Sequence, residues 1–243
     1  MSEALTEIVA GSAMPEDVSA LQLLLTADPA LMAIVGLSLV VSGTAVLLAA
    51  LIGLPLGAWV ALVPFPGREG VIVALNAMMG LPPVVVGLAV YLLLSRSGPL
   101  ASLGMLFTPQ AMILAQTMLI APIIAALSRQ TIGDLWVEYR EEFAAMDVGP
   151  ANRVATLLWD ARFSLVTALL AGFGRAAAEV GAVMIVGGNI EGYTRTVTTA
   201  VALETSKGDL PLAIGLGLVL AVIVCLVNAA AWGLRRAGKQ FAG

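Results

Sequence analysis

Charged residues are absent from four long stretches of the chain, and hydrophobic residues dominate each of them. The uncharged stretches cover residues 29–67, 70–95, 97–128 and 210–234. Each is longer than the roughly 20 apolar residues that a helix needs to cross a hydrocarbon core of about 30 Å. With a further apolar stretch that carries only two charges, the pattern predicts an all-α integral membrane protein. Its predicted transmembrane helices, about five in number, cover residues 31–63, 70–94, 100–127, 164–186 and 210–232.

Prolines and glycines interrupt the predicted spans. Pro55 lies in the first span, Pro109 and Pro122 lie in the third, and the second is broken by Gly-Leu-Pro-Pro at residues 80–83. Non-helical backbone at membrane depth occurs only where it is buried in protein or faces a cavity. The break at Pro82 and Pro83 is therefore either a packed kink or part of a pore or gate. Asn76, one turn earlier, fits either reading.

One long polar passage, residues 136–162, lies between the third and fourth predicted spans. Trp136, Tyr139, Phe143 and Met146 recur at helical spacing, with charged residues on the other faces. A left-handed conformation at Gly149 would end this helix, and Pro150 suits the first turn of the next one. The passage is thus expected to form two short helices joined at a Gly-Pro corner, within a loop at about 130–163. Since no separate soluble domain fits, residues 1–243 are expected to form a single transmembrane domain.

Composition supports the membrane assignment and excludes several kinds of chemistry. The chain is 60% hydrophobic and 12% charged, too apolar for a soluble domain of 243 residues. With no His and one Cys, it lacks the ligands for haem, thiolate clusters or His-bound metals, so no metal site is expected. The sequence holds neither a Gly-x-x-x-x-Gly-Lys-Ser/Thr phosphate loop nor the residues of a Ser/His/Asp set. A net charge of −4 gives no reason to expect a nucleic-acid partner.

The distribution of positive charge predicts how the chain crosses the membrane. No Lys or Arg precedes Arg68, so no cleavable signal is expected and the amino end is free to lie outside; residues 21–26 are a candidate lead-in helix. Five spans then place the 136–162 passage and the carboxyl end in the cytoplasm. This arrangement puts eight positive charges inside and three outside. The inside set is Arg68, Arg129, Arg140, Arg153, Arg162, Arg235, Arg236 and Lys239, and the outside set is Arg96, Arg195 and Lys207.

The fourth predicted span carries Arg175 and Glu179, four residues apart. On one helix they would share a face and could pair, which lowers the cost of burying charge. One interpretation is a structural ion pair that locks two helices, or an Arg175 side chain that reaches the cytoplasmic face. The other places Arg175 beside a hydrophilic path, where a cation would favour an anionic substrate.

A polar, threonine-rich loop follows this span at residues 187–209. Residues 196–206 are expected to form a short helix closed by Gly208. The loop is either a solvated connection or, given its length, a functional segment. Asn189 at its beginning is a candidate residue of a transport path.

The polar passage also carries a family resemblance. Ala144-Ala145, three intervening residues and Gly149 resemble the "EAA" loop of permease subunits in ATP-binding-cassette (ABC) importers, with Phe143 at the place of the leading Glu. The Arg-x-x-x-Glu-x-Gly-Ala segment at 175–182 resembles the matching span of oxyanion-importer permeases. Together with the 187–209 loop, it is similar to the tungstate-type branch of the molybdate/tungstate/sulfate permeases.

This resemblance implies a type I importer permease in the plasma (inner) membrane, surrounded by lipid and paired with a second copy of itself. Two ABC ATPase subunits, which hold the ATP and Mg, would dock on the loop through Glu141, Glu142, Ala144, Ala145 and Gly149. An extracytoplasmic binding protein would deliver the oxyanion, tungstate first and molybdate next. The chain would then be a transport subunit and not an enzyme, and would bind no cofactor itself.

Two other functions remain open at this point. A secondary anion carrier driven by an ion gradient would need a titratable site within the membrane, for which Glu179 is the acidic candidate, and it would not need the cytoplasmic loop. An intramembrane enzyme, such as a lipid-modifying transferase, is disfavoured by the absence of His and by the shortage of nucleophiles or acids within the spans.

Overall fold

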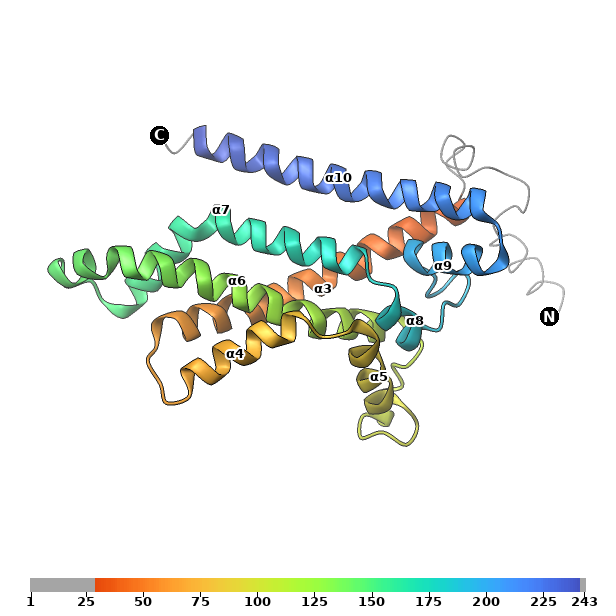
Figure 1. The fold of residues 1–243 in the computed structure, drawn as a ribbon, viewed down its shortest axis with the longest axis horizontal. Helices are drawn as coiled ribbons and strands as arrows, with labels where there is room; N and C mark the ends of the chain where they lie inside the picture. The colour runs from red at the N-terminus through yellow and green to blue at the C-terminus, as the bar shows by residue number, and fades with distance from the viewer. Residues whose placement is uncertain (1–28, 241–243) are drawn as a thin grey trace. The chain divides into compact units, whose positions relative to one another are not determined.

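The computed structural model describes residues 29–240, and within them the chain forms helices and connections without β-strands. Figure 1 shows the ribbon. The elements are α3 (Pro29–Leu62), α4 (Arg68–Met79), α5 (Pro83–Leu94), the 3₁₀ turn η1 (Ala101–Leu103), α6 (Pro109–Ala145), α7 (Pro150–Ala177), α8 (Gly181–Gly187), α9 (Val197–Lys207) and α10 (Leu210–Gln240). The expected lead-in helix at 21–26 and the placement of the amino end lie outside the described residues.

Four described helices are long and apolar enough to cross a membrane: α3, α6, α7 and the Leu210–Ala230 part of α10. The pair α4 and α5 passes the same test only when taken together, which raises the count to five. The predicted all-α membrane fold with about five spans is therefore confirmed. The expected break in the second span is also present, because α4 ends at Met79 and α5 begins at Pro83.

Contacts divide the chain into two compact units. Of the described residues, the first consists of 29–44, Pro82–Gln116 and Ala176–Val227, and the second of Ala45–Leu81, Thr117–Arg175 and 228–240. Several long helices therefore contribute one end to each unit.

In the first unit, α5 and α8 pack side by side (Figure 1). Their contact is close because glycines lie in it: a Cβ atom on Gly181 would come within 2.7 Å of the Val84 side chain. A second cluster joins the start of α3 to α9 and α10. Its buried residues are Leu31, Ile34, Val197, Ala200, Leu212 and Leu216. Helix α9 is tied to α3 by a hydrogen bond from the Val197 backbone N–H to Ser38 Oγ (2.9 Å).

In the second unit, the end of α3 packs against α6 and α7. Gly57 allows the backbones to approach, since a Cβ atom there would lie 2.5 Å from the Ala125 carbonyl oxygen. Small residues serve this purpose in membrane helix packing. Arg68 closes the end of α3, because its guanidinium donates to the carbonyls of Val60 (2.7 Å) and Ala61 (3.0 Å).

Two expected spans have different bounds in the structure. The third was expected from Leu100, but α6 begins at Pro109, after turns in which Gly104 and Phe107 have φ of 59° and 62°. Thr108 precedes the helix and accepts a hydrogen bond from the Ala111 N–H (3.5 Å), as an N-cap does. The fourth was expected to continue to Val186, but α7 ends at Ala177 and the separate helix α8 follows.

Side chains satisfy the backbone groups that the break between α7 and α8 frees. Gln116 Nε2 donates to the Ala176 carbonyl (3.0 Å), and Thr198 Oγ1 donates to the Glu179 carbonyl (2.9 Å). The Glu179 carboxylate accepts from the Ala182 N–H (2.9 Å) at the start of α8. Irregular backbone at membrane depth needs such partners.

Candidate coupling elbow and transport path

The connection between α6 and α7, called the elbow below, is the tight turn of residues 146–149. The Val148 N–H donates back to the Phe143 carbonyl (3.1 Å), and Asp147 has a left-handed φ of 50°. The expectation that Gly149 supplies the left-handed residue is therefore wrong: Gly149 is not among the residues with positive φ. Pro150 does begin the next helix, as expected. The two arms are the ends of α6 and α7, so they are extensions of spanning helices and not separate short ones.

An aromatic cluster packs beside the elbow, at the end of α6. Phe143 is buried and packs with Leu157 and Ala161 of α7 and with Ala61 of α3. The rings of Trp136 and Tyr139 lie 6.2 Å and 6.0 Å from that of Phe143, centroid to centroid.

The predicted apolar face at Trp136, Tyr139 and Phe143 is thus confirmed as the packed face of this arm. Met146, the fourth member of that face, is 65% exposed instead. It follows Ala145, the last residue of α6.

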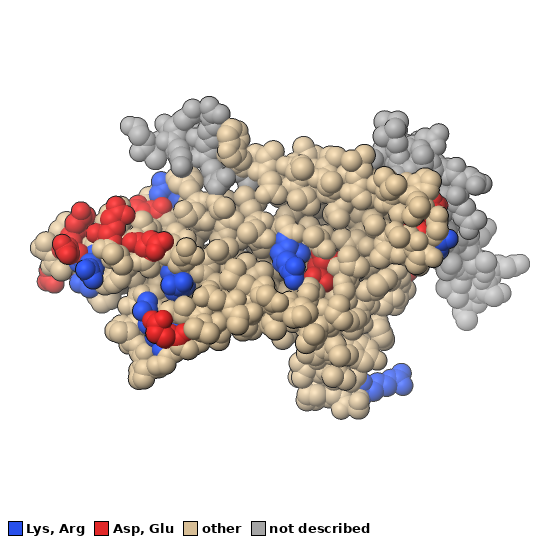
Figure 2. Space-filling view, viewed as in Figure 1, with Lys and Arg blue, Asp and Glu red and all other residues tan. Residues whose placement is uncertain are grey.

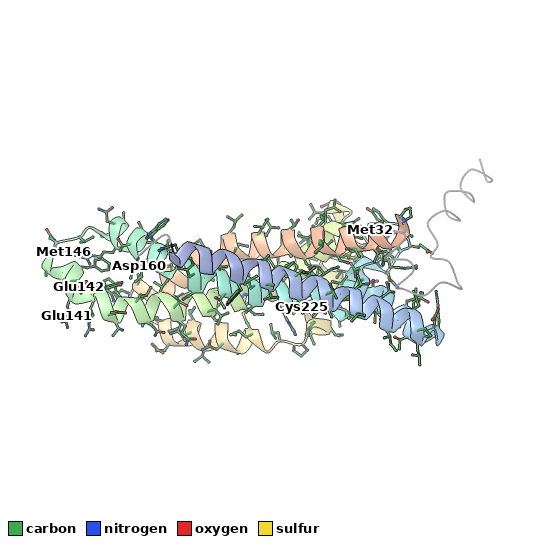
Figure 3. The ribbon with its side chains drawn as sticks, turned by 90° about the horizontal axis from the view of Figure 1, so that it is seen from above. Met32, Glu141, Glu142, Met146, Asp160 and Cys225 are labelled. Atoms are coloured by element: carbon green, nitrogen blue, oxygen red, sulfur yellow. The ribbon has the colours of Figure 1, made fainter. Side chains whose placement is uncertain are left out.

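All five residues expected to contact an ATPase are exposed: Glu141, Glu142, Ala144, Ala145 and Gly149. Figure 3 shows Glu141, Glu142 and Met146 at the end of α6, with Asp160 on the adjoining arm of α7. Acidic and basic side chains gather around this end of α6 (Figure 2). Val137 and Trp159, like Met146, expose roughly two thirds of their surface here, at 64% and 68%. The elbow therefore offers charged and apolar groups together.

Two polar interactions lie on the arms of the elbow. Arg153 Nε donates to the Val148 carbonyl (2.6 Å) across the turn. The negative charge of Asp160, together with partial burial and the charges of Glu138 and Glu142, raises the pKa of Tyr139 above its ordinary 10.0. Tyr139 on α6 is consequently neutral beside the Asp160 carboxylate of α7.

The expected path residues of the second span fall on both sides of its break. Asn76 is exposed on α4, in the second unit. Pro82 precedes α5 in an extended conformation and Pro83 is its first residue, both in the first unit. Neither proline has an N–H to donate, which explains why α4 cannot continue.

Arg175 and Glu179 do not share a helix face. Arg175 is in the last turn of α7, whereas Glu179 lies beyond the end of that helix and is buried. The spacing of four residues predicts a pair only if the helix continues, and it ends at Ala177. The expected pairing on one helix is therefore wrong, and the Glu179 carboxylate instead holds the first turn of α8.

The connection from α8 to α9 is ordered by threonines. Thr194 Oγ1 donates to the Gly187 carbonyl (2.6 Å) and accepts from the Ile190 N–H (2.8 Å). Asn189 has a φ of 50°, and its side-chain oxygen is buried without a hydrogen-bond partner. The expected helix after Thr196 is confirmed as α9, and Gly208 closes it with a φ of 89°.

Two features were not singled out from the sequence. One is a groove of about 470 Å³ between α6 and α7 in the second unit, lined in part by Gln130, Thr131, Asp134 and Ser164. The other is Arg195, whose Nε is buried without a partner. The polar residues of these two features do not form a recognisable motif in the sequence, and only the fold brings them together. Among the described residues, no group of three or more His, Cys, Asp or Glu is placed to hold a metal.

Known proteins resemble the chain along most of its length. It is 43% identical over 204 residues to a protein of Haloferax volcanii named "Probable anion ABC transporter permease protein", covering 82% of this chain and 88% of that one. It is 38% identical over 217 residues to the "Tungstate uptake system permease protein TupB" of Peptoclostridium acidaminophilum, covering 89% and 95%. The chain belongs to the ABC-transporter permease family of the molybdate/tungstate type.

A more distant relative of the permease is the "Molybdenum transport system permease protein ModB" of Azotobacter vinelandii. The two are 27% identical over 180 residues, which cover 70% of the permease and 79% of that protein. No protein-family model matches the chain. The permease is accordingly a multi-pass membrane transport subunit.

Proposed function

We propose that the permease is the membrane subunit of an ATP-driven importer for tetrahedral oxyanions, with tungstate as the first candidate and molybdate as the second. The observation that carries the proposal is the 38% identity to a tungstate uptake permease over 95% of that protein's length. The elbow supports it, because its aromatic anchor is buried while the residues of the "EAA"-like motif are free to meet a partner.

ATP and Mg²⁺ belong in this account to a separate ABC ATPase, because the permease has no phosphate loop of its own. Closure of two ATPase subunits would draw together the elbows of two permease copies. Glu141 and Glu142 would meet basic residues of the ATPase, and Ala144, Ala145 and Gly149 would permit close contact. Since the elbow continues directly into α6 and α7, its movement passes to the spans without an intervening joint.

The proposed orientation places the elbow and the carboxyl end in the cytoplasm and the amino end outside. The eight-to-three distribution of positive charge supports it. Helix α7 is one span. The elbow precedes it and the 187–196 connection comes after it, beyond the short helix α8, so we place the two on opposite sides of the membrane. An extracytoplasmic binding protein would then deliver the oxyanion on the side of residues 187–196.

For the path, we propose the two helix breaks at Pro82–Pro83 and at residues 178–180. Asn76, Arg175, Glu179 and Asn189 are the polar side chains nearest to these breaks along the chain. In many transporters, helix breaks that face protein or water are where the substrate binds and where the path opens and closes.

The test is reconstitution of the permease into proteoliposomes with a candidate ATPase and binding protein. ATP hydrolysis and uptake are measured while tungstate, molybdate, sulfate and phosphate are offered in turn. The proposal predicts uptake that requires ATP and persists when ionophores collapse all ion gradients. Uptake that continues without ATPase and stops with ionophores would instead identify a secondary carrier.

A further inference from the structure

A small pocket opens in the first unit between the start of α3 and the connection that precedes α9. It has a volume of about 130 Å³. Apolar side chains of α3, among them Ile34 and Leu37, form one wall, and Glu191, Tyr193 and Arg195 form the other. The pocket thus brings one guanidinium and one carboxylate against an apolar surface.

The Arg195 guanidinium is only partly satisfied within this pocket. Its Nη1 lies 3.1 Å from Glu191 Oε1, and its side chain is 12% exposed. Its Nε is buried and has no hydrogen-bond partner. Buried donors without partners are uncommon in folded proteins, because each forfeits its hydrogen bond to water. The chain supplies no acceptor for the Nε–H, and only the exposed eighth of the Arg195 side chain can meet a ligand in the pocket.

The backbone that carries Arg195 is held firmly. The Arg195 N–H donates to the Ile190 carbonyl (3.0 Å), and the hydroxyl of Thr194 beside it both donates and accepts a hydrogen bond. Thr196, the next residue, caps α9. A guanidinium on such a rigid support is ordered before any ligand arrives, which lowers the entropic cost of binding.

We propose that this pocket binds a tetrahedral oxyanion through the guanidinium of Arg195, and that Glu191 competes with the anion for the same guanidinium. The proposal rests on the proposed function, for which it names an entry site on the side of residues 187–196. A planar guanidinium presents N–H pairs that match two oxygens of an oxyanion, which a round halide cannot do. Glu191 is more exposed than its partner, at 37% against 12%, so its carboxylate can withdraw when the anion binds.

The experiment measures tungstate binding to the full-length permease in nanodiscs of uncharged lipid, by equilibrium dialysis with metal analysis. Arg195→Gln is expected to raise the Kd about tenfold or more, because a charge-assisted hydrogen bond is lost. Arg195→Lys, which keeps the charge but loses the fork, should also weaken binding. Glu191→Gln should lower the Kd, and sulfate should compete where chloride does not. The matched control is Arg96→Gln, which removes one exposed positive charge elsewhere in the same unit and should leave the Kd unchanged.

Glu191→Gln and Arg195→Gln should change the Kd for tungstate in opposite directions, and this distinguishes a binding site from a structural ion pair. If Glu191→Gln and Arg195→Gln both weaken binding, or neither changes it, the proposal is wrong. A gain of affinity in Glu191→Gln cannot arise from misfolding. Thermal unfolding of each variant shows whether a loss of affinity comes from a loss of stability. ATP-driven uptake by the complete complex separates the two claims. Wild-type uptake of tungstate with an unaltered KM in Arg195→Lys would reject the site alone, whereas no oxyanion uptake by the wild type would reject the proposed function.

Discussion

Gly87 of α5 lies directly against Ala182 of α8: a Cβ atom added at Gly87 would come within 2.6 Å of the Ala182 Cα. This contact joins two short helices that each follow a break in a span, so it holds the proposed path region together. The obstacle is backbone, which cannot move aside as the end of a flexible side chain can.

We therefore expect Gly87→Ala to destabilise the permease by about 1–3 kcal/mol, the range for overpacking a filled contact. Gly36→Ala is the matched control, because Gly36 is also helical and nothing lies within 4 Å of a Cβ atom there. That control should be neutral, or more stable by up to about 1 kcal/mol from helix propensity. Thermal unfolding of both variants in one detergent is the measurement. Equal melting temperatures for the two would contradict the packing described.

At the elbow, Asp147 and Gly149 should respond differently to substitution. Asp147→Gly should keep or raise the melting temperature, while Asp147→Val should cost on the order of 1–2 kcal/mol, because its φ of 50° suits glycine and strains a β-branched residue. Gly149→Ala should have no effect, since a Cβ atom at Gly149 meets nothing within 4 Å. If Gly149→Ala lowers the melting temperature more than Asp147→Val does, the turn is not built as described.

Gly149→Val then serves as a test of coupling. The fold tolerates a side chain at this exposed position. We expect the variant to insert normally and to lose oxyanion uptake while the ATPase still hydrolyses ATP, because the added bulk would lie in the proposed partner contact. Uptake and hydrolysis are measured in the same proteoliposomes. Uptake at the wild-type rate would count against the role of the elbow.

Tyr139 and Asp160 give a prediction about pH. The raised pKa of Tyr139 means that the neutral phenol is favoured in the folded state. The stability that the neutral phenol contributes is thus fully present below about pH 10, where an unfolded tyrosine titrates, and is lost as the pH rises through the folded pKa. Tyrosinate absorbance of the wild type minus that of Tyr139→Phe should report a phenol that titrates above about pH 10. Asp160→Asn should lower this midpoint, and no movement would disprove this effect of Asp160.

Thr196, the N-cap of α9, should matter more for stability than Thr205 within that helix. Its side chain accepts from the Thr199 N–H and completes a reciprocal cap at the start of the helix. Thr196→Ala should therefore cost about 1 kcal/mol or somewhat more. Thr205→Ala is the control, because that exposed hydroxyl bonds to the Val201 carbonyl within the same helix. Thermal unfolding should show a lower melting temperature for Thr196→Ala alone, and the reverse order would refute the capping role.

The parts of the fold that the sequence predicted are those that backbone chemistry determines locally. The four uncharged stretches identify membrane helices because the bilayer excludes charge, and Pro82–Pro83 breaks a helix wherever it stands. Thr108-Pro109 is likewise a local start signal for α6, because Thr108 can cap the helix and Pro109 suits its first turn.

The features that the sequence did not predict depend on distant partners. The break after Ala177 contains neither Pro nor Gly, and the side chains that donate hydrogen bonds to its carbonyls, Gln116 and Thr198, come from 60 and 19 residues away. Periodicity alone therefore extended the helix and paired Arg175 with Glu179. The pocket around Arg195 was missed for the same reason, since α3 and the 187–196 connection meet only in the fold.

Met146 offers a test of the proposal that an ATPase contacts the elbow from the cytoplasm. This side chain is 65% exposed at the end of α6, and Cys225 is the chain's one cysteine. In a Cys225→Ala background, Met146→Cys is crosslinked to single-cysteine variants of the ATPase in the complete complex, with and without ATP. We expect a crosslink whose yield changes with ATP, and no reaction of the introduced thiol with a membrane-impermeant reagent added outside intact cells. Labelling from outside, with no crosslink to the ATPase, would contradict it.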